Sequence, residues 1–191
     1  MNSNQGPYTS LPANLPVPRD DGSCRHLPGT DLPDVSLLAT SGEWVQPRQR
    51  PGLVVLYTYP MTGRPGVALP EGWDQIPGAR GCTPQACSFR DHHAEMRRLG
   101  AEVFGLSSQS TEYQREVHSR LHLPFPLLSD ETFAFADALQ LPTFVSHGVR
   151  LLKRLTLIVV RGRIEHVFYP IFPPDRHIHQ VLQYLEDQRR G

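Results

Sequence analysis

The apolar run from Leu53 to Tyr59 (LVVLYTY) restricts the fold of this chain more than any other stretch. It is nearly continuous and contains β-branched and aromatic residues. Such a pattern, without alternation between polar and apolar positions, predicts a strand that is buried on both faces. The rest of the fold must therefore cover two sides of a sheet.

Strands and helices alternate along most of the remaining sequence. We expect hairpins at 35–45 and 154–171, strands at 53–59 and 101–108, a short extended piece at 124–130, and helices at 83–100, 110–123, 131–141 and 175–190. Ser110 and Asp175 are the expected N-terminal caps of two of these helices. This order predicts a mixed sheet with helices on both faces. It is typical of a thioredoxin-like α/β fold with an additional N-terminal hairpin.

Two regions of the chain differ in composition. Residues 1–33 are rich in proline and are interpreted as an extended arm, either wrapped on the domain or loose. Residues 34–191 form the predicted domain. The arm carries Cys24, which we interpret as a thiol without a function.

The totals exclude several classes of function. The formal net charge is +0 and the pI is about 7.1, so we expect no nucleic-acid partner. No stretch reaches the roughly 20 apolar residues of a membrane span. The N-terminus has neither a basic head nor an apolar run, which indicates a cytoplasmic protein. Three cysteines are too few for a disulfide scaffold.

The segment 61–81 (MTGRPGVALPEGWDQIPGARG) separates the first buried strand from the next helix. It is rich in glycine and proline and shows no periodic pattern. A loop of this length is unusual in a compact domain and commonly has a function, such as a lid.

Cys82 and Cys87 lie close together in the stretch GCTPQAC, where this loop gives way to a helix. Pro84 suits the first helical turn, which places Cys82 at the helix start. Free N–H groups and the helix dipole favour an anion there, and a thiolate is such an anion. Cys82 is therefore the candidate nucleophile, and Cys87 lacks this advantage.

The spacing of the two thiols restricts how they can react with each other. Residues five apart in a regular helix have Cα atoms about 8.6 Å apart. A disulfide needs about 4.4–6.8 Å. A bond between Cys82 and Cys87 therefore requires at least one helical turn to unwind.

Three other interpretations of this pair remain open. The spacing of two helical cysteines can be chance. A metal site could use Cys82, Cys87, His92 and His93, although zinc motifs usually have closer cysteines and adjacent helical histidines diverge. A thiol–disulfide exchange centre would normally contain C-x-x-C, which is absent.

The stretch GCTPQACSFRD resembles the active-site segment of the peroxiredoxins of the bacterioferritin-comigratory, or Q, type, within the AhpC/TSA superfamily. LYTYP, PFPLLSD and the arginine of RLTLIV support the resemblance, which runs from about residue 34 to the C-terminus. It implies that Cys82 is the peroxidatic cysteine and Cys87 the resolving one. It also implies that Arg154 supports the reacting sulfur.

The chain departs from the family pattern P-x-x-x-T-x-x-C, because Gln75 and Ala79 stand at its proline and threonine positions. An insertion follows Pro60 instead. Thr62 is the nearby hydroxyl that could bind peroxide, and our hypothesis is that it replaces the missing threonine.

These features together predict a thiol peroxidase that reduces hydrogen peroxide and organic hydroperoxides. The resemblance implies an intrachain disulfide reduced by thioredoxin or a similar dithiol protein, without metal, haem or flavin. We expect a monomer or weak homodimer. The alternatives are a non-catalytic redox sensor or binding module on the same fold, and a thioredoxin-like reductase.

Overall fold

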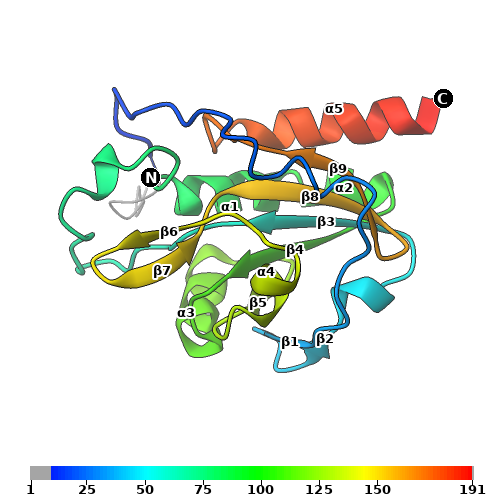
Figure 1. Cartoon of the computed structure of the whole chain (residues 1–191), viewed down its shortest axis with the longest axis horizontal. Helices are drawn as coiled ribbons and strands as arrows, with labels where there is room; N and C mark the ends of the chain where they lie inside the picture. Colours follow the sequence, from blue (N-terminus) through cyan, green and yellow to red (C-terminus); the bar gives the residue numbers. More distant parts are fainter. Residues whose placement is uncertain (1–9, 191) are drawn as a thin grey trace, which may run out of the picture.

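A seven-stranded mixed sheet forms the centre of the protein (Figure 1), as seen in a computed structural model that describes residues 10–190. Its strand order is β2-β1-β5-β4-β3-β8-β9. The strands are β1 (Leu37–Ala39), β2 (Trp44–Val45), β3 (Leu53–Thr58), β4 (Ala101–Ser107), β5 (Leu127–Ser129), β8 (Leu155–Val160) and β9 (Arg163–Phe168). β3 pairs in parallel with β4 and antiparallel with β8, so the predicted buried strand lies near the middle of the sheet.

Alternate residues of β3 contribute to two separate cores. Val55 and Tyr57 belong to the core under the helices α1 (Cys82–Asp91), α2 (His93–Arg98), α3 (Thr111–Leu121) and α5 (His177–Arg190). Val54 and Leu56 belong to the core on the opposite face, which includes the short helix α4 (Ala134–Ala138). Successive strand residues point to opposite faces, which explains the division. The thioredoxin-like α/β fold is confirmed, with most of its helices on one face.

The end of the N-terminal arm belongs to the second core. Leu27 and Leu32 are completely buried in it, and Cys24 is buried beside them. Backbone hydrogen bonds join Gly29 and Leu32 to the β8–β9 hairpin, at 2.7 and 2.8 Å. This part of the arm is therefore wrapped on the domain. Its apolar side chains help α4 to bury that face of the sheet. The beginning of the arm, residues 1–9, lies outside the described residues.

The helix predicted at 83–100 is instead two helices that meet at His92, so the prediction of one continuous helix was wrong. His92 has φ −106° and ψ 10°, outside the helical region. Its imidazole Nδ1 lies 3.0 Å from the carbonyl oxygen of Ser88, and its own N–H also donates to that carbonyl. The side chain and backbone of His92 thus converge on one carbonyl, and α1 ends there.

The structure also corrects three smaller predictions. A separate hairpin, β6 (Thr143–Ser146) with β7 (Val149–Leu152), was not predicted. Its turn residues His147 and Gly148 both have positive φ, which is the requirement of a type I′ hairpin turn.

The helix expected at 131–141 is limited to α4, and α5 begins at His177, beyond the expected cap Asp175. The Ser110 cap is confirmed, because its hydroxyl accepts from the Tyr113 N–H at 3.2 Å.

Within residues 10–190, no helix combines the length and the apolar character that crossing a membrane requires.

Candidate active site

Cys82 is the first residue of α1, as the sequence predicted, and its side chain is 4% exposed. The preceding residue, Gly81, has φ 103°, in the left-handed region that favours glycine. A Cβ at Gly81 would also lie 2.5 Å from Pro174 and 2.7 Å from Leu11. Glycine is therefore required at this position for both backbone and space, and α1 begins directly after it with Cys82.

Arg154 reaches Cys82 from the start of β8. Its Nη2 donates to the Cys82 Sγ at 3.2 Å, and the arginine side chain is buried. The structure thus brings together two residues that the resemblance had paired. A buried guanidinium in this position can donate a hydrogen bond to the sulfur and to a bound oxygen.

Backbone carbonyl groups hold the guanidinium of Arg154 in place. Its Nε donates to the Gly78 carbonyl at 3.3 Å, and its Nη2 lies 3.2 Å from the carbonyls of both Ala79 and Arg80. Its Nη1 donates to Gln85 Oε1. Sequence reasoning missed all of these partners. Gln85 stands inside GCTPQAC, which was a signal, whereas backbone carbonyls leave none in a sequence.

The segment 61–81 lies over Cys82 and is called the cover below. It contains the short 3-10 helix η2 (Trp73–Gln75), and Trp73 and Ala79 pack with Leu151 of β7 in a small third core. The cavity that touches Cys82 has a volume of about 10 Å³. Its lining includes Met61, Gly63, Leu69 and Trp73 from the cover, together with Thr83. Residues of the inserted segment thus form most of the lining of the space at Cys82.

A second cavity, of about 270 Å³, has an apolar lining that includes Phe144 and Ile171. Arg154 lines this cavity, but Cys82 does not. This larger cavity therefore does not border the Cys82 sulfur.

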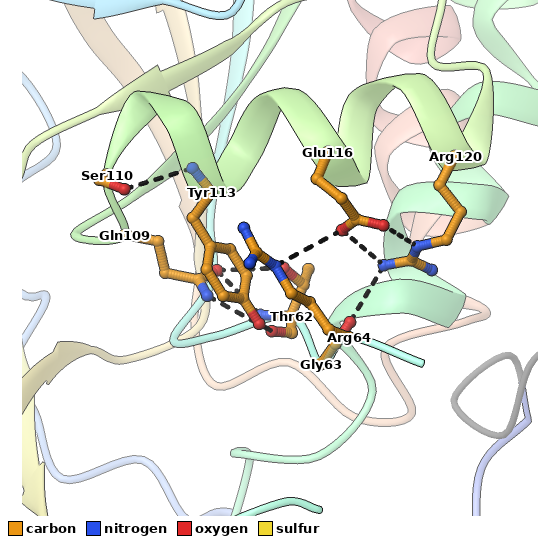
Figure 2. A network of polar contacts seen from close by, with 8 residues as sticks. All are labelled: Thr62, Gly63, Arg64, Gln109, Ser110, Tyr113, Glu116 and Arg120. Carbon is orange, nitrogen blue, oxygen red and sulfur yellow. Dashed lines mark hydrogen bonds and ion pairs between the residues drawn. The ribbon is translucent and has the colours of Figure 1, made fainter. Parts of the chain in front are cut away.

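Thr62 does not lie beside the thiol. Its hydroxyl donates to Gln109 Oε1 at 3.1 Å, and its side chain is buried (Figure 2). Its neighbours Met61 and Gly63 line the cavity at Cys82, but Thr62 is not part of that lining. Thr83 is the threonine that does line it. The structure therefore places the Thr62 hydroxyl against Gln109, just before α3, and outside the lining of the cavity at Cys82.

Cys87 lies on the same helix as Cys82 and is half-buried. Burial raises the pKa of its thiol. Both thiols are free, and α1 is continuous between them. Among residues 10–190, no three or more histidine, cysteine or acidic side chains gather in a way that could hold a metal ion.

The redoxin family model matches residues 27–185. The chain belongs to the redoxin family. The match begins within the arm, at the completely buried Leu27.

Similar proteins narrow the class of this redoxin. A chloroplastic peroxiredoxin Q of Oryza sativa subsp. japonica is 28% identical over 93% of this chain and 77% of its own length. A chloroplastic peroxiredoxin Q of Sedum lineare is 32% identical over 65% of this chain and 64% of its own. The solved structure of the peroxidoxin BcpB from Mycobacterium tuberculosis has a TM-score of 0.68 and 24% identity, covering 85% of this chain and 98% of that one. The resemblance to Q-type peroxiredoxins is confirmed, and the chain is a thiol-dependent peroxidase.

The geometry of this redoxin supplies what a thiol peroxidase needs at its first step. The sulfur lies at a helix N-terminus and contacts a fixed guanidinium, and both groups stabilise negative charge. Burial lowers the pKa of His177 to about 4, and the same guanidinium has a smaller effect in the same direction. His177 is therefore neutral near pH 7, and it adds no second positive charge beside Arg154.

Proposed function

We propose that this redoxin reduces peroxides through a two-cysteine cycle, with Cys82 as the peroxidatic and Cys87 as the resolving residue. The observation that supports it most directly is the contact of 3.2 Å between Arg154 Nη2 and Cys82 Sγ at the start of α1. Cys87 follows on the same helix, as the family motif implies.

The first step is a displacement at oxygen. The Cys82 thiolate attacks one peroxide oxygen, the O–O bond breaks, and sulfur is oxidised to a sulfenic acid. The second oxygen leaves with the bonding electron pair and takes up a proton, giving water from hydrogen peroxide or an alcohol from an organic hydroperoxide. Donors from Arg154 and from the α1 N-terminus stabilise the charge on the leaving oxygen.

The second step forms a disulfide. The Cys87 sulfur attacks the sulfur of the Cys82 sulfenic acid, the S–O bond breaks, and the hydroxyl leaves as water with the proton of the Cys87 thiol. The two residues lie in a continuous helix. Since residues five apart in a helix are separated by about 8.6 Å, the start of α1 must unwind for this step.

The third step restores the thiols. A dithiol protein of the thioredoxin type transfers two electrons and two protons to the Cys82–Cys87 disulfide and is itself oxidised to a disulfide. No metal or organic cofactor takes part in this cycle.

Mass spectrometry after one equivalent of hydrogen peroxide tests this assignment. We expect the wild type to lose about 2 Da as the disulfide forms, and Cys87→Ser to gain about 16 Da as a sulfenic acid. Cys82→Ser should keep its mass. A Cys82→Ser variant that consumes peroxide as fast as wild type would refute the assignment. If peroxide oxidises Cys82 but no dithiol supports repeated turnover, the alternative of a non-catalytic redox sensor is favoured.

A further inference from the structure

The space at Cys82 is small compared with the peroxides that a peroxidase can meet. The cavity that Cys82 lines has a volume of about 10 Å³, against about 270 to 410 Å³ for four other cavities in the described part of the chain. Hydrogen peroxide, with two heavy atoms, needs the least additional space there. A hydroperoxide with an aromatic or long alkyl group needs much more space beside Met61, Leu69 and Trp73, which line this cavity.

The cover also occupies the donors that a peroxide would use. Nε and Nη2 of Arg154 donate to the carbonyls of Gly78, Ala79 and Arg80, all within the cover. Arginine has five N–H groups in a fixed planar arrangement. A peroxide that bonds to Nη2 must therefore compete with these carbonyls, and a shift of the cover would release the donors.

A network on α3 fastens the beginning of the cover (Figure 2). The Tyr113 hydroxyl donates to the Thr62 carbonyl at 2.8 Å, and Arg120 Nη2 donates to the Gly63 carbonyl at 3.0 Å. The Arg64 guanidinium lies over the Tyr113 ring, 4.1 Å from its centroid. We call these contacts the α3 latch. They hold residues 62–64, and Gly63 in this segment lines the Cys82 cavity.

We propose that the cover is a size filter, held closed by the α3 latch, that admits hydrogen peroxide and disfavours bulky organic hydroperoxides. This inference rests on the proposed function. It assigns Tyr113 and Arg120, which do not line the cavity, a role in substrate choice through the position of the cover.

The experiment compares kcat/KM for hydrogen peroxide and for cumene hydroperoxide in wild type, Tyr113→Phe and Arg120→Ala. Arg115→Ala is the matched control, because Arg115 is also on α3 and donates to a carbonyl, that of Thr40, outside the cover. We expect wild type to prefer hydrogen peroxide about tenfold or more. Each latch variant should narrow the preference for hydrogen peroxide about three- to fivefold, as expected for the loss of its hydrogen bond to the cover. Arg115→Ala should not change it.

Equal rates with the two peroxides in wild type would overturn the filter, as would latch variants whose preference matches that of Arg115→Ala. Alkylation of Cys82 distinguishes a failure of the size filter from a failure of the proposed peroxidase cycle. The rate of Cys82 alkylation, followed by peptide mapping, should change little with iodoacetamide in the latch variants. With a bulky aryl maleimide, that rate should rise about three- to fivefold in the same variants. This readout needs no turnover, and identical gains for the two reagents would also overturn the filter.

Discussion

At the scale of single residues, the sulfur of Cys82 depends on groups from two distant parts of the chain. It is 4% exposed, so water contributes little to the solvation of a thiolate there. Arg154 and the N-terminus of α1 replace that solvation. The cover carbonyls and Gln85 keep the guanidinium aimed at the sulfur, so its direction is fixed before substrate arrives.

Replacement of this guanidinium tests its role. We expect Arg154→Lys to lower the rate of Cys82 oxidation by hydrogen peroxide about a hundredfold, because an ammonium cannot reproduce the planar set of donors. Stopped-flow measurement of oxidation gives the rate. Arg150→Lys is the matched control, since Arg150 donates to the exposed carboxylate of Asp137 on the surface. Similar rates in both variants would show that Arg154 does not support the reacting sulfur.

Thr62 provides a second test at this scale. Thr62→Val removes one hydrogen bond to Gln109 and keeps the backbone contacts of residue 62. We expect a loss of about 1 kcal/mol in the free energy of unfolding, with peroxidase kcat/KM for hydrogen peroxide within about threefold of wild type. Urea denaturation and steady-state kinetics measure the two effects. A hundredfold fall in kcat/KM would show that the Thr62 hydroxyl does act at the peroxide site.

At the scale of elements, the proposed two-cysteine cycle places opposite requirements on α1. Its first step uses an intact first turn, whose free N–H groups favour negative charge at the helix N-terminus. Its second step needs the same turn unwound. Phe89, further along α1, is completely buried and stacks on Tyr57 with ring centroids 4.4 Å apart. We therefore expect the C-terminal half of the helix to stay anchored while its beginning opens.

Far-UV circular dichroism can detect this opening. Oxidation of wild type by one equivalent of hydrogen peroxide should reduce the helical signal at about 222 nm by an amount equal to one or two turns, roughly four to seven residues. Addition of a dithiol should restore it. Cys87→Ser, which cannot form the disulfide, should keep its signal after oxidation. An unchanged spectrum in disulfide-bonded wild type would contradict the unwinding step.

At the scale of the whole molecule, buried histidines connect stability to pH. Burial lowers the pKa of His177 to about 4, from its usual value of 6.5, and its ring nitrogens lie 2.9 Å from Thr156 Oγ1 and Gln180 Oε1. Burial lowers the pKa values of His93, His118 and His166 as well. The unfolded chain therefore binds protons at pH values where the folded protein does not, and stability falls as the pH falls through this range.

The expected size of this effect can be measured by urea denaturation. Between about pH 7 and about pH 5, His177 alone should lower the free energy of unfolding by about 2 kcal/mol. His177→Gln should reduce the difference between the two pH values by about that amount, leaving the smaller contribution of the other histidines. An equal difference in wild type and His177→Gln would mean that the buried imidazole is not neutral in the folded state.

Local patterns in the sequence determined much of this protein. The apolar run at 53–59 specified a central strand, because residues that suit burial on both faces fit only inside a layered sheet. Gly81 and Pro84 specified the start of α1, since backbone conformation at a helix terminus depends on neighbouring residues. The sequence could therefore predict Cys82 as the nucleophile, and the motif GCTPQAC indicated the family.

Only the tertiary structure decided what surrounds that cysteine. Arg154 is 72 positions away in sequence, and only the motif resemblance linked it to Cys82 before the contact was seen. The cover has no periodic pattern, so its path depends on distant partners, Leu151 on one side and α3 on the other. The Thr62 hydroxyl bonds to Gln109, another distant residue, and does not line the cavity at Cys82. Short-range preferences set where an element begins, whereas long-range packing sets which side chains and carbonyls meet.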